Sequence, residues 1–193
     1  ISHVNKLVGN IIQTLKDNGL YENTIIIFAG DNGLAVGQHG LMGKQNVYEH
    51  SVGVPLMIKA AAQHTGKKTA DLCYLIDVFP TLCDMLQLPV PQSVDGISLL
   101  SSLDGEEPVR DYLYYSYMDN QRGISDGTWK LIEYHVNGKR TTQLFNLKND
   151  PWERNDLSGQ KKYEKTIQRL REKMAEEQKR TNDTSVFWNN FSY

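Results

Sequence analysis

The first apolar residues of the chain recur every three or four positions, which places their side chains on one face of an α-helix. These positions are Val4, Leu7, Val8, Ile11, Ile12 and Leu15. We therefore predict an amphipathic helix over residues 3–17. Asn18 and Gly19 follow it directly and supply its stop signal.

Two short apolar runs come next, of the kind that forms buried strands. The first, TIIIFA at residues 24–29, is unbroken and rich in β-branched residues. Such a run is typical of a strand covered on both faces, as in a parallel sheet between helix layers. The second, VPLMIK, spans residues 54–59. Because a helix followed by a buried strand is half of a doubly wound unit, the pattern predicts an α/β fold class.

A second helix is predicted after a polar loop. Asp77 stands at its N-cap position and Pro80 in its first turn, where proline is tolerated. Its expected buried stripe consists of Val78, Leu82, Met85 and Leu86. A linker containing Pro89, Pro91 and Gly96 follows.

The pattern changes near residue 108, where short runs separated by turns predict antiparallel strands. Asn137-Gly138 is a strong hairpin signal, and Asp126-Gly127 marks another turn. A charged helix is predicted over residues 160–180, with an inner stripe of Ile167, Leu170, Arg171 and Met174. We expect the apolar tail residues Phe187, Trp188 and Phe191 to pack on the body. The predicted domains are thus an α/β layer over 1–107 and a small antiparallel sheet with a helix over 108–193.

Composition narrows the class of partner. The chain has 193 residues and a net charge of −2, so its charge gives no argument for nucleic acid. The sequence contains no run of about 18 apolar residues, so it predicts no membrane-spanning helix. The chain begins inside a predicted helix, without an initiator Met or a signal-peptide pattern, so we expect it to be part of a longer protein. The sequence therefore does not indicate a cellular location. Cys73 and Cys83 match no common zinc spacing and are expected to be buried thiols.

The segment between the two predicted strands, FAGDNGLAVGQHGLMGKQNVYEH, is unusually polar. Ligands of open α/β sheets bind at the carboxyl ends of strands, which is where Asp31 and Asn32 stand. A carboxylate beside an amide oxygen suits Ca²⁺ or Mg²⁺. The alternative is simple turn formation, for which Asp-Asn-Gly is well suited.

His39 and Lys44 complete a candidate site. His39 lies between glycines that allow close approach of a ligand, although a loop histidine is also compatible with plain surface exposure. Lys44 provides a point charge for anionic oxygens, or only solubility. A metal, a histidine and a lysine together describe a site for a tetrahedral oxyanion. We assign Glu49 a structural role, as a cap or tether of the loop, and leave His50 open.

At this point the sequence closely resembles the second signature region of the sulfatases, in the alkaline-phosphatase-like superfamily. That pattern is a buried strand, D-N-G, a G-x-H-G turn, G-K, Y-E and a V-P strand, all present within residues 28–58. YLIDVFPTLCDMLQLPVPQSVDGISL resembles the family's D-x-x-P-T helix and D-G-x-S-L turn. RGISDGTWKLIEY and LFNLKNDPWERNDLS resemble its C-terminal subdomain. The likeness spans nearly the whole chain and is greatest to the carbohydrate-directed bacterial branch.

The resemblance implies particular roles. Asp31 and Asn32 match two divalent-metal ligands, usually for Ca²⁺, with Mg²⁺ as the other candidate. Lys44 matches the lysine that contacts the sulfate, and His39 a histidine that lines the substrate pocket in several branches. Residues 1–107 would be the C-terminal part of the catalytic α/β/α layer, and the substrate a sulfated carbohydrate or small molecule. A periplasmic or secreted location is the family expectation.

Departures from the family pattern are equally informative. Sulfatases use a formylglycine made in a C/S-x-P/A-x-R segment, and neither Cys73 nor Cys83 begins one. The first metal pair and a second lysine–histidine pair are also absent, and Gly53 stands where relatives often carry arginine. We therefore expect a C-terminal portion of a sulfatase whose nucleophile and remaining metal ligands come from a missing N-terminal part. The chain alone is expected to be inactive.

Two alternatives stay open: a phosphoric ester hydrolase of the same superfamily, and a non-catalytic interaction module that pairs through a sheet edge. Part of a large sheet would also expose a broad apolar face, which predicts association with the missing half or with a second copy. Asn182-Asp183-Thr184 and Asn190-Phe191-Ser192 fit glycosylation acceptors that only a secreted eukaryotic chain would use.

Overall fold

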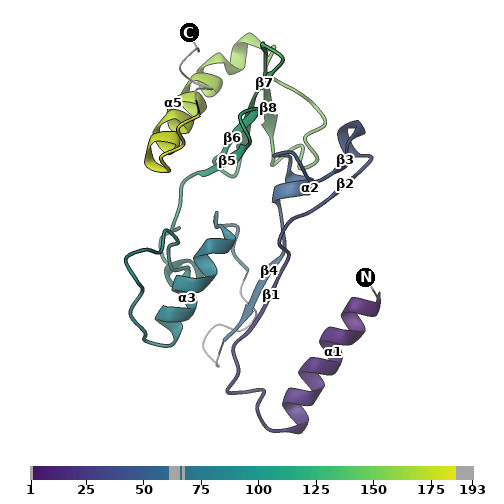
Figure 1. The fold of residues 1–193 in the computed structure, drawn as a ribbon, viewed down its shortest axis with the longest axis vertical. Coiled ribbons are helices and arrows are strands. Elements are labelled where there is room, and N and C mark those ends of the chain that lie inside the picture. The colour runs from purple at the N-terminus through teal and green to yellow at the C-terminus, as the bar shows by residue number, and fades with distance from the viewer. Residues whose placement is uncertain (1, 61–65, 67, 186–193) are drawn as a thin grey trace.

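The computed structural model describes residues 2–60, 66 and 68–185, which form two regions (Figure 1). The N-terminal region, residues 2–107, contains α1 (Ser2–Asp17), the strand pair β1 (Ile26–Ala29) and β4 (Leu56–Lys59), α3 (Val78–Met85) and α4 (Leu100–Asp104). The C-terminal region, residues 108–185, contains a four-stranded sheet and α5 (Glu164–Arg180). The α/β class predicted from the sequence is confirmed.

The C-terminal region is built on a regular antiparallel sheet. Its order is β5 (Leu113–Tyr117), β6 (Gln121–Ser125), β7 (Trp129–Val136) and β8 (Lys139–Asn146). The predicted hairpin at Asn137-Gly138 joins β7 to β8, with φ of 51° and 74°, the positive values that its turn type requires. The short 3₁₀ turn η3 (Lys161–Tyr163) leads into α5, the predicted charged helix.

Both faces of this sheet are covered. On one face α5 packs over a core made of Tyr114, Ile124, Leu131, Leu144, Ile167, Leu170 and Met174. On the other face Val47 and Tyr48 pack on Ile132 and Phe145. Because Val47 and Tyr48 belong to the polar segment between β1 and β4, that segment is attached to the C-terminal sheet, although it starts from the N-terminal one.

The N-terminal region is much more open. The predicted first helix is present as α1, yet none of its residues is buried, and Ile11 is 62% exposed. Figure 1 shows α1 standing apart from the rest of the chain. Its apolar stripe therefore has no covering element among the described residues.

Two predictions about the strands were wrong. β1 and β4 pair antiparallel, with Ile26 opposite Lys59, and not in a parallel arrangement. Nor is β1 covered on both faces, since Phe28 is 37% exposed, and Met57 on β4 is 58% exposed. An apolar run indicates that a strand tends to be buried, but it does not indicate whether the strand pairs parallel or antiparallel with its neighbour.

Corrections also apply around α3. Asp77 stands at the N-cap position of α3 as predicted, but its carboxylate makes no capping bond there; it caps the preceding 3₁₀ turn η2 (Leu75–Asp77) by accepting from the backbone N–H of Tyr74. Leu86, predicted to be buried, is 55% exposed. Both cysteines are free thiols, and Cys83 is buried as expected, but Cys73 is only half-buried. Burial raises the pKa of Cys73.

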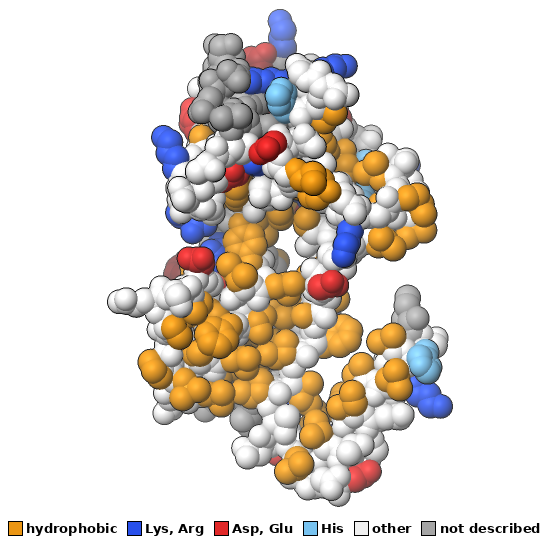
Figure 2. Space-filling model, viewed as in Figure 1, with side chains coloured by type: hydrophobic (Ala, Val, Ile, Leu, Met, Phe, Trp, Pro, Cys, Tyr) orange, Lys and Arg blue, Asp and Glu red, His pale blue; other side chains and the backbone are white. Residues whose placement is uncertain are grey.

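Apolar side chains collect on one face of the N-terminal region, and Figure 2 shows this face as a broad orange area. The large exposed residues of this part of the chain include Phe28, Met57, Leu75, Ile76, Phe79, Leu86 and Leu88. No helix in the described part of the chain is long and apolar enough to cross a membrane. Phe187, Trp188 and Phe191, which were expected to pack on the body, lie outside the described residues.

Candidate active-site cleft

A cleft of about 1100 Å³ lies between the two regions. Asp31, Asn32 and Lys44 line it from the polar segment, and Arg110 and Tyr115 line it from the C-terminal region. The cleft therefore collects three of the four candidate site residues from the sequence. We refer to it below as the main cleft.

Asp31 and Asn32 follow β1 directly, as predicted, and a close backbone contact fixes their position. The N–H of Gly33 donates to the backbone oxygen of Ser51 over 2.9 Å. A Cβ atom on Gly33 would lie 2.0 Å from the backbone oxygen of His50, so only glycine fits here. The Asp-Asn-Gly segment is thus packed against the short helix α2 (Glu49–Val52).

Lys44 lies beside Asn32 although twelve positions separate them. The Lys44 ammonium donates to Oδ1 of Asn32 over 2.9 Å, and the amide nitrogen of Asn32 donates to the backbone oxygen of Gly33. Two minimal strands, β2 (Ala35–Val36) and β3 (Met42–Gly43), pair antiparallel and bring Lys44 back toward the start of the segment. An ammonium and two oxygen-bearing side chains therefore share one spot on the wall of the main cleft.

His39 lies elsewhere. It belongs to the 3₁₀ turn η1 (Gln38–Gly40) and has a left-handed φ of 53°. Its ring stacks on Tyr48 at 4.0 Å between centroids, and its Nε2 lies 3.2 Å from the backbone oxygen of Trp152. It lines a second, smaller cleft with Tyr134 and Gln143. The substrate-pocket role of His39 thus stays a prediction, because the structure does not bring His39 into the main cleft.

His50 is part of the same aromatic stack, 5.6 Å from Tyr48. Burial lowers the pKa of its imidazole, and the charges of His39 and Lys130 lower it further. Its Nε2 is buried and has no hydrogen-bond partner among the described residues. Tyr48 fastens the stack to the sheet, since its hydroxyl donates to Gln143 over 2.6 Å.

Glu49 has the tethering contacts expected of it. Its Oε1 accepts from the Lys130 ammonium at 2.8 Å, and its backbone N–H donates to Glu153 over 2.6 Å. Sequence reasoning missed Lys130 and Glu153. Their signal was present, because both fall within the stretches that resemble the sulfatase C-terminal subdomain, as the lysine of W-K and the glutamate of D-P-x-E.

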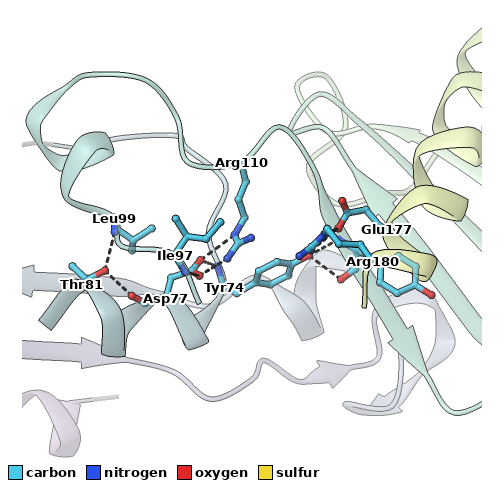
Figure 3. A network of polar contacts seen from close by, with 9 residues as sticks. Tyr74, Asp77, Thr81, Ile97, Leu99, Arg110, Glu177 and Arg180 are labelled. Atoms are coloured by element: carbon cyan, nitrogen blue, oxygen red, sulfur yellow. Dashed lines mark hydrogen bonds and ion pairs between the residues drawn. The ribbon is translucent and has the colours of Figure 1, made fainter. Parts of the chain in front are cut away.

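A buried polar network borders the main cleft where the two regions meet (Figure 3). Asp77 accepts from the backbone N–H groups of Tyr74 and Ile97, over 2.7 and 2.8 Å, and forms an ion pair with Arg110. The Arg110 guanidinium also lies over the Tyr74 ring, 4.7 Å from its centroid. The Tyr74 hydroxyl in turn accepts from the backbone N–H of Tyr114 on β5. This network joins η2, the linker and the C-terminal sheet.

The donor set in the main cleft fits part of a metal site. Asp31 and Asn32 offer hard oxygens, the ligands that Ca²⁺ and Mg²⁺ take in proteins. The described residues contain no group of three or more histidine, cysteine or acidic side chains that could hold an ion. Because Ca²⁺ takes six to eight oxygens, Asp31 and Asn32 alone would supply only some of the ligands of such a site.

Comparison with known proteins identifies the family. The family model described as N-sulphoglucosamine sulphohydrolase, C-terminal, matches residues 37–180. The chain belongs to this sulfatase family. The match includes Lys44, the Glu49 tether and the whole C-terminal sheet, and it confirms the resemblance drawn from the sequence.

Individual relatives agree with this assignment. The chain is 28% identical over 193 residues to an N-acetylglucosamine-6-O-sulfatase of Bacteroides thetaiotaomicron, covering 93% of this chain and 34% of the relative. It is 32% identical over 165 residues to a choline-sulfatase of Rhizobium meliloti, covering 82% of this chain and 31% of the relative. The chain thus spans about a third of the length of these curated relatives.

Solved structures show the same fold. A protein in complex with its substrate D-glucosamine-2-N,6-O-disulfate superposes with a TM-score of 0.84 and 27% identity, over 96% of this chain and 40% of that one. The phosphonate monoester hydrolase of Agrobacterium radiobacter gives a TM-score of 0.77 and 26% identity, over 91% of this chain and 39% of that one. Sulfatases and a phosphonate hydrolase therefore share this architecture.

Proposed function

We propose that this chain is the C-terminal portion of a sulfatase that hydrolyses sulfate esters, with sulfated carbohydrates as the substrate class. One observation carries the proposal: Lys44 and Asn32 lie 2.9 Å apart on the wall of a large cleft, beside Asp31, in a chain of the sulfatase family. Carbohydrate sulfates are the favoured class because two of the relatives described above are named for sulfated glucosamine substrates.

In this proposal Lys44 binds the sulfate. Its ammonium is a compact positive charge that attracts the peripheral oxygens of a tetrahedral anion. The contact with Asn32 holds that charge at the cleft wall, so little reorganisation is needed when charge develops on the ester. Asp31 and Asn32 would hold Ca²⁺ or Mg²⁺, which when bound would neutralise negative charge on the sulfate.

The nucleophile would come from a different part of the protein. The sulfatase resemblance expects a formylglycine, and the 193 residues contain no C/S-x-P/A-x-R segment that could form it. The exposed apolar face of the N-terminal region supports the same idea, because contiguous apolar surface marks an interaction site. We propose that this face packs against the N-terminal part of the sulfatase. A second copy of this chain is the alternative occupant.

The test compares the 193-residue chain with the protein encoded by the complete reading frame that contains it. We expect the complete protein to release sulfate from an aryl sulfate, and the 193-residue chain to be inactive. Lys44→Met in the complete protein should lower kcat by about 10²–10³-fold, as when one charge-stabilising donor is removed. The matched control is Lys148→Met, a lysine in an exposed turn outside the main cleft. Robust turnover by the 193-residue chain would overturn the expectation of inactivity.

A second function is favoured by one comparison. The Agrobacterium radiobacter phosphonate monoester hydrolase has the same architecture at a similar level of identity. The assay should therefore include an aryl phosphonate monoester beside the aryl sulfate. If the complete protein hydrolyses the aryl phosphonate monoester and leaves the aryl sulfate intact, the protein is a phosphonate monoester hydrolase and the sulfatase proposal is wrong.

A further inference from the structure

A cluster of three charged residues, two of them fully buried, lies at the wall of the main cleft. Lys130, on β7, has a fully buried side chain whose Nζ lies 2.8 Å from Oε1 of Glu49 and 3.0 Å from Oε1 of Glu153. Glu153 is 1% exposed, whereas the Glu49 side chain is 33% exposed and lines the main cleft. The ammonium also lies 5.0 Å from the centroid of the Tyr115 ring. We call Glu49, Lys130 and Glu153 the tether cluster.

The tether cluster binds the first residue of α2, Glu49, through its side chain and through its backbone. Lys130 holds the side chain of Glu49, the first residue of the helix. Glu153 accepts from the backbone N–H of the same residue, over 2.6 Å. Glu153 has a φ of 54°, a conformation that is uncommon for a residue with a side chain and that persists only when its surroundings enforce it. Side chain and backbone of Glu49 are thus both fixed from the C-terminal region.

From α2 the contacts continue to the candidate sulfate site. Gly33 donates to Ser51 of α2 and touches the backbone of His50 so closely that no Cβ fits between them. Asn32 precedes Gly33 and accepts from Lys44. A displacement of α2 toward the Asp31–Gly33 segment would displace that segment, because the close contact leaves no free space, and a displacement away from it would break the Gly33–Ser51 hydrogen bond.

We propose that the tether cluster sets the position of Asp31, Asn32 and Lys44, so that Lys130 and Glu153 are positioning residues of the anion site. This inference rests on the proposed function and adds a role for residues that lie outside the cleft. The cluster's contribution is to geometry. Desolvation offsets much of the attraction within a buried ion pair, so such pairs are weak sources of net stability. Partners that orient the groups around a metal or anion typically change affinity or activity by about 10–100-fold when mutated.

The experiment compares two buried glutamates in ion pairs that involve β7: Glu153 pairs with Lys130 of β7, and Glu133 lies on β7 and pairs with Arg171 of α5. Glu153→Gln removes the charge that faces Lys130 and keeps the shape of the side chain. The matched control is Glu133→Gln, because Glu133 is also fully buried on β7 and pairs with Arg171 at 2.7 Å, but it belongs to the contact with α5. We expect Glu153→Gln to lower kcat for an aryl sulfate in the complete protein by about 10–100-fold. Glu133→Gln should leave kcat within about twofold.

Thermal unfolding is measured beside activity. The proposal requires that Glu153→Gln lose activity at a melting temperature no lower than that of the control. Equal activity losses in both variants, or a loss that only follows the unfolded fraction, would overturn it. If Glu153→Gln does not fold, Glu153→Asp takes its place, since it keeps the charge but shortens the reach to Lys130 and Glu49.

A second readout separates this inference from the proposed function. Backbone amide NMR shifts of Asn32, Gly33 and Lys44 are recorded in the 193-residue chain, without any substrate. Glu153→Gln should move these three signals, and Glu133→Gln should leave them in place. If Glu153→Gln moves the three signals but the complete protein shows no sulfatase activity, the proposed function is overturned and the tether is retained. If the complete protein is an active sulfatase but Glu153→Gln leaves the three signals in place, the tether is overturned and the proposed function is retained.

Discussion

The two sheets of the molecule differ in how their apolar side chains are covered. In the four-stranded sheet Ile124, Leu131 and Leu144 are completely buried. In the β1–β4 pair, Phe28 is 37% exposed and Met57 58% exposed, although the sequence of that pair is at least as apolar. Apolar composition alone therefore does not decide burial. The difference lies in which covering elements the described chain supplies.

The comparison shows where the fold is self-sufficient. The C-terminal sheet has α5 on one face and residues 47–48 on the other, so its core is closed. Within the part of the chain that the structure describes, the β1–β4 pair has no comparable cover, and α1 and α3 present apolar residues to solvent. The candidate sulfate site lies at the border between the two regions, because Asn32 follows β1 of the open region and Lys44 precedes the Val47–Tyr48 segment that packs on the closed one.

The largest effect should follow from cutting the junction between the two regions. Asp77→Ala would leave the guanidinium of Arg110, whose side chain is 6% exposed, without its carboxylate, and two backbone N–H groups without their acceptor. Breaking a buried ion pair in this way costs about 3–5 kcal/mol. Hydrogen exchange followed by mass spectrometry should show protection lost over residues 74–105 and kept over β5 to β8.

The control for this change is Glu176→Ala. Glu176 pairs with Lys173 at 2.7 Å on the surface of α5, where the two side chains are 62% and 39% exposed. Such a pair contributes at most about 1 kcal/mol. A uniform loss of protection across both regions in Asp77→Ala would contradict the view that the C-terminal sheet is stable by itself.

A smaller effect should distinguish a covered apolar residue from an uncovered one. Leu170 of α5 is fully buried, so Leu170→Ala should lower the free energy of unfolding by about 2–5 kcal/mol. Ile11 of α1 is 62% exposed, and Ile11→Ala should stay within about 0.5 kcal/mol. Urea unfolding of the 193-residue chain measures both. A large loss in Ile11→Ala would mean that α1 is covered in solution, for instance by a second copy.

The same comparison explains how far the sequence could predict the fold. Helical spacing predicted α1 and α5, and Asn137-Gly138 predicted the β7–β8 hairpin, because these features depend on neighbours in the sequence. The direction of β1 and the exposure of Phe28 could not be predicted in this way. They depend on which strand pairs with β1 and on what packs over it, and neither is encoded within the run itself.

The candidate site divides along the same line. Asp31, Asn32, His39 and Lys44 were expected to converge because they follow one strand, but the structure places only Asp31, Asn32 and Lys44 in the main cleft and His39 in the smaller one. His39 could not be placed, because no sequence pattern predicts the left-handed φ of 53° at His39 or the stacking of its ring on Tyr48. Lys130 and Glu153 reach Glu49 from 81 and 104 positions away, a distance at which no local spacing rule applies.

The smallest predicted effect concerns how far the closed region extends beyond α5. Asp183 accepts from the Tyr114 hydroxyl over 2.6 Å and from the Arg122 guanidinium over 2.7 and 3.1 Å, which ties the chain after α5 to β5 and β6. Burial alone would raise the pKa of the Asp183 carboxyl, but the hydrogen bonds from Arg122 and Tyr114 outweigh burial and lower it. The ionised form is therefore favoured by folding.

The sign of the pH dependence follows from that direction. Because the folded pKa of Asp183 lies below its ordinary value of 3.8, its contribution is present above pH 3.8 and is lost as the pH falls through the folded pKa. Asp183→Asn should lower the free energy of unfolding at pH 6 by about 1.5–3 kcal/mol, the value of a hydrogen bond to a charged group, and this difference should shrink below pH 3.8. Asp84→Asn, at an exposed position of α3, is the control. Urea unfolding at both pH values measures the difference, and an equal deficit at each would show that Asp183 acts through shape and not through its charge.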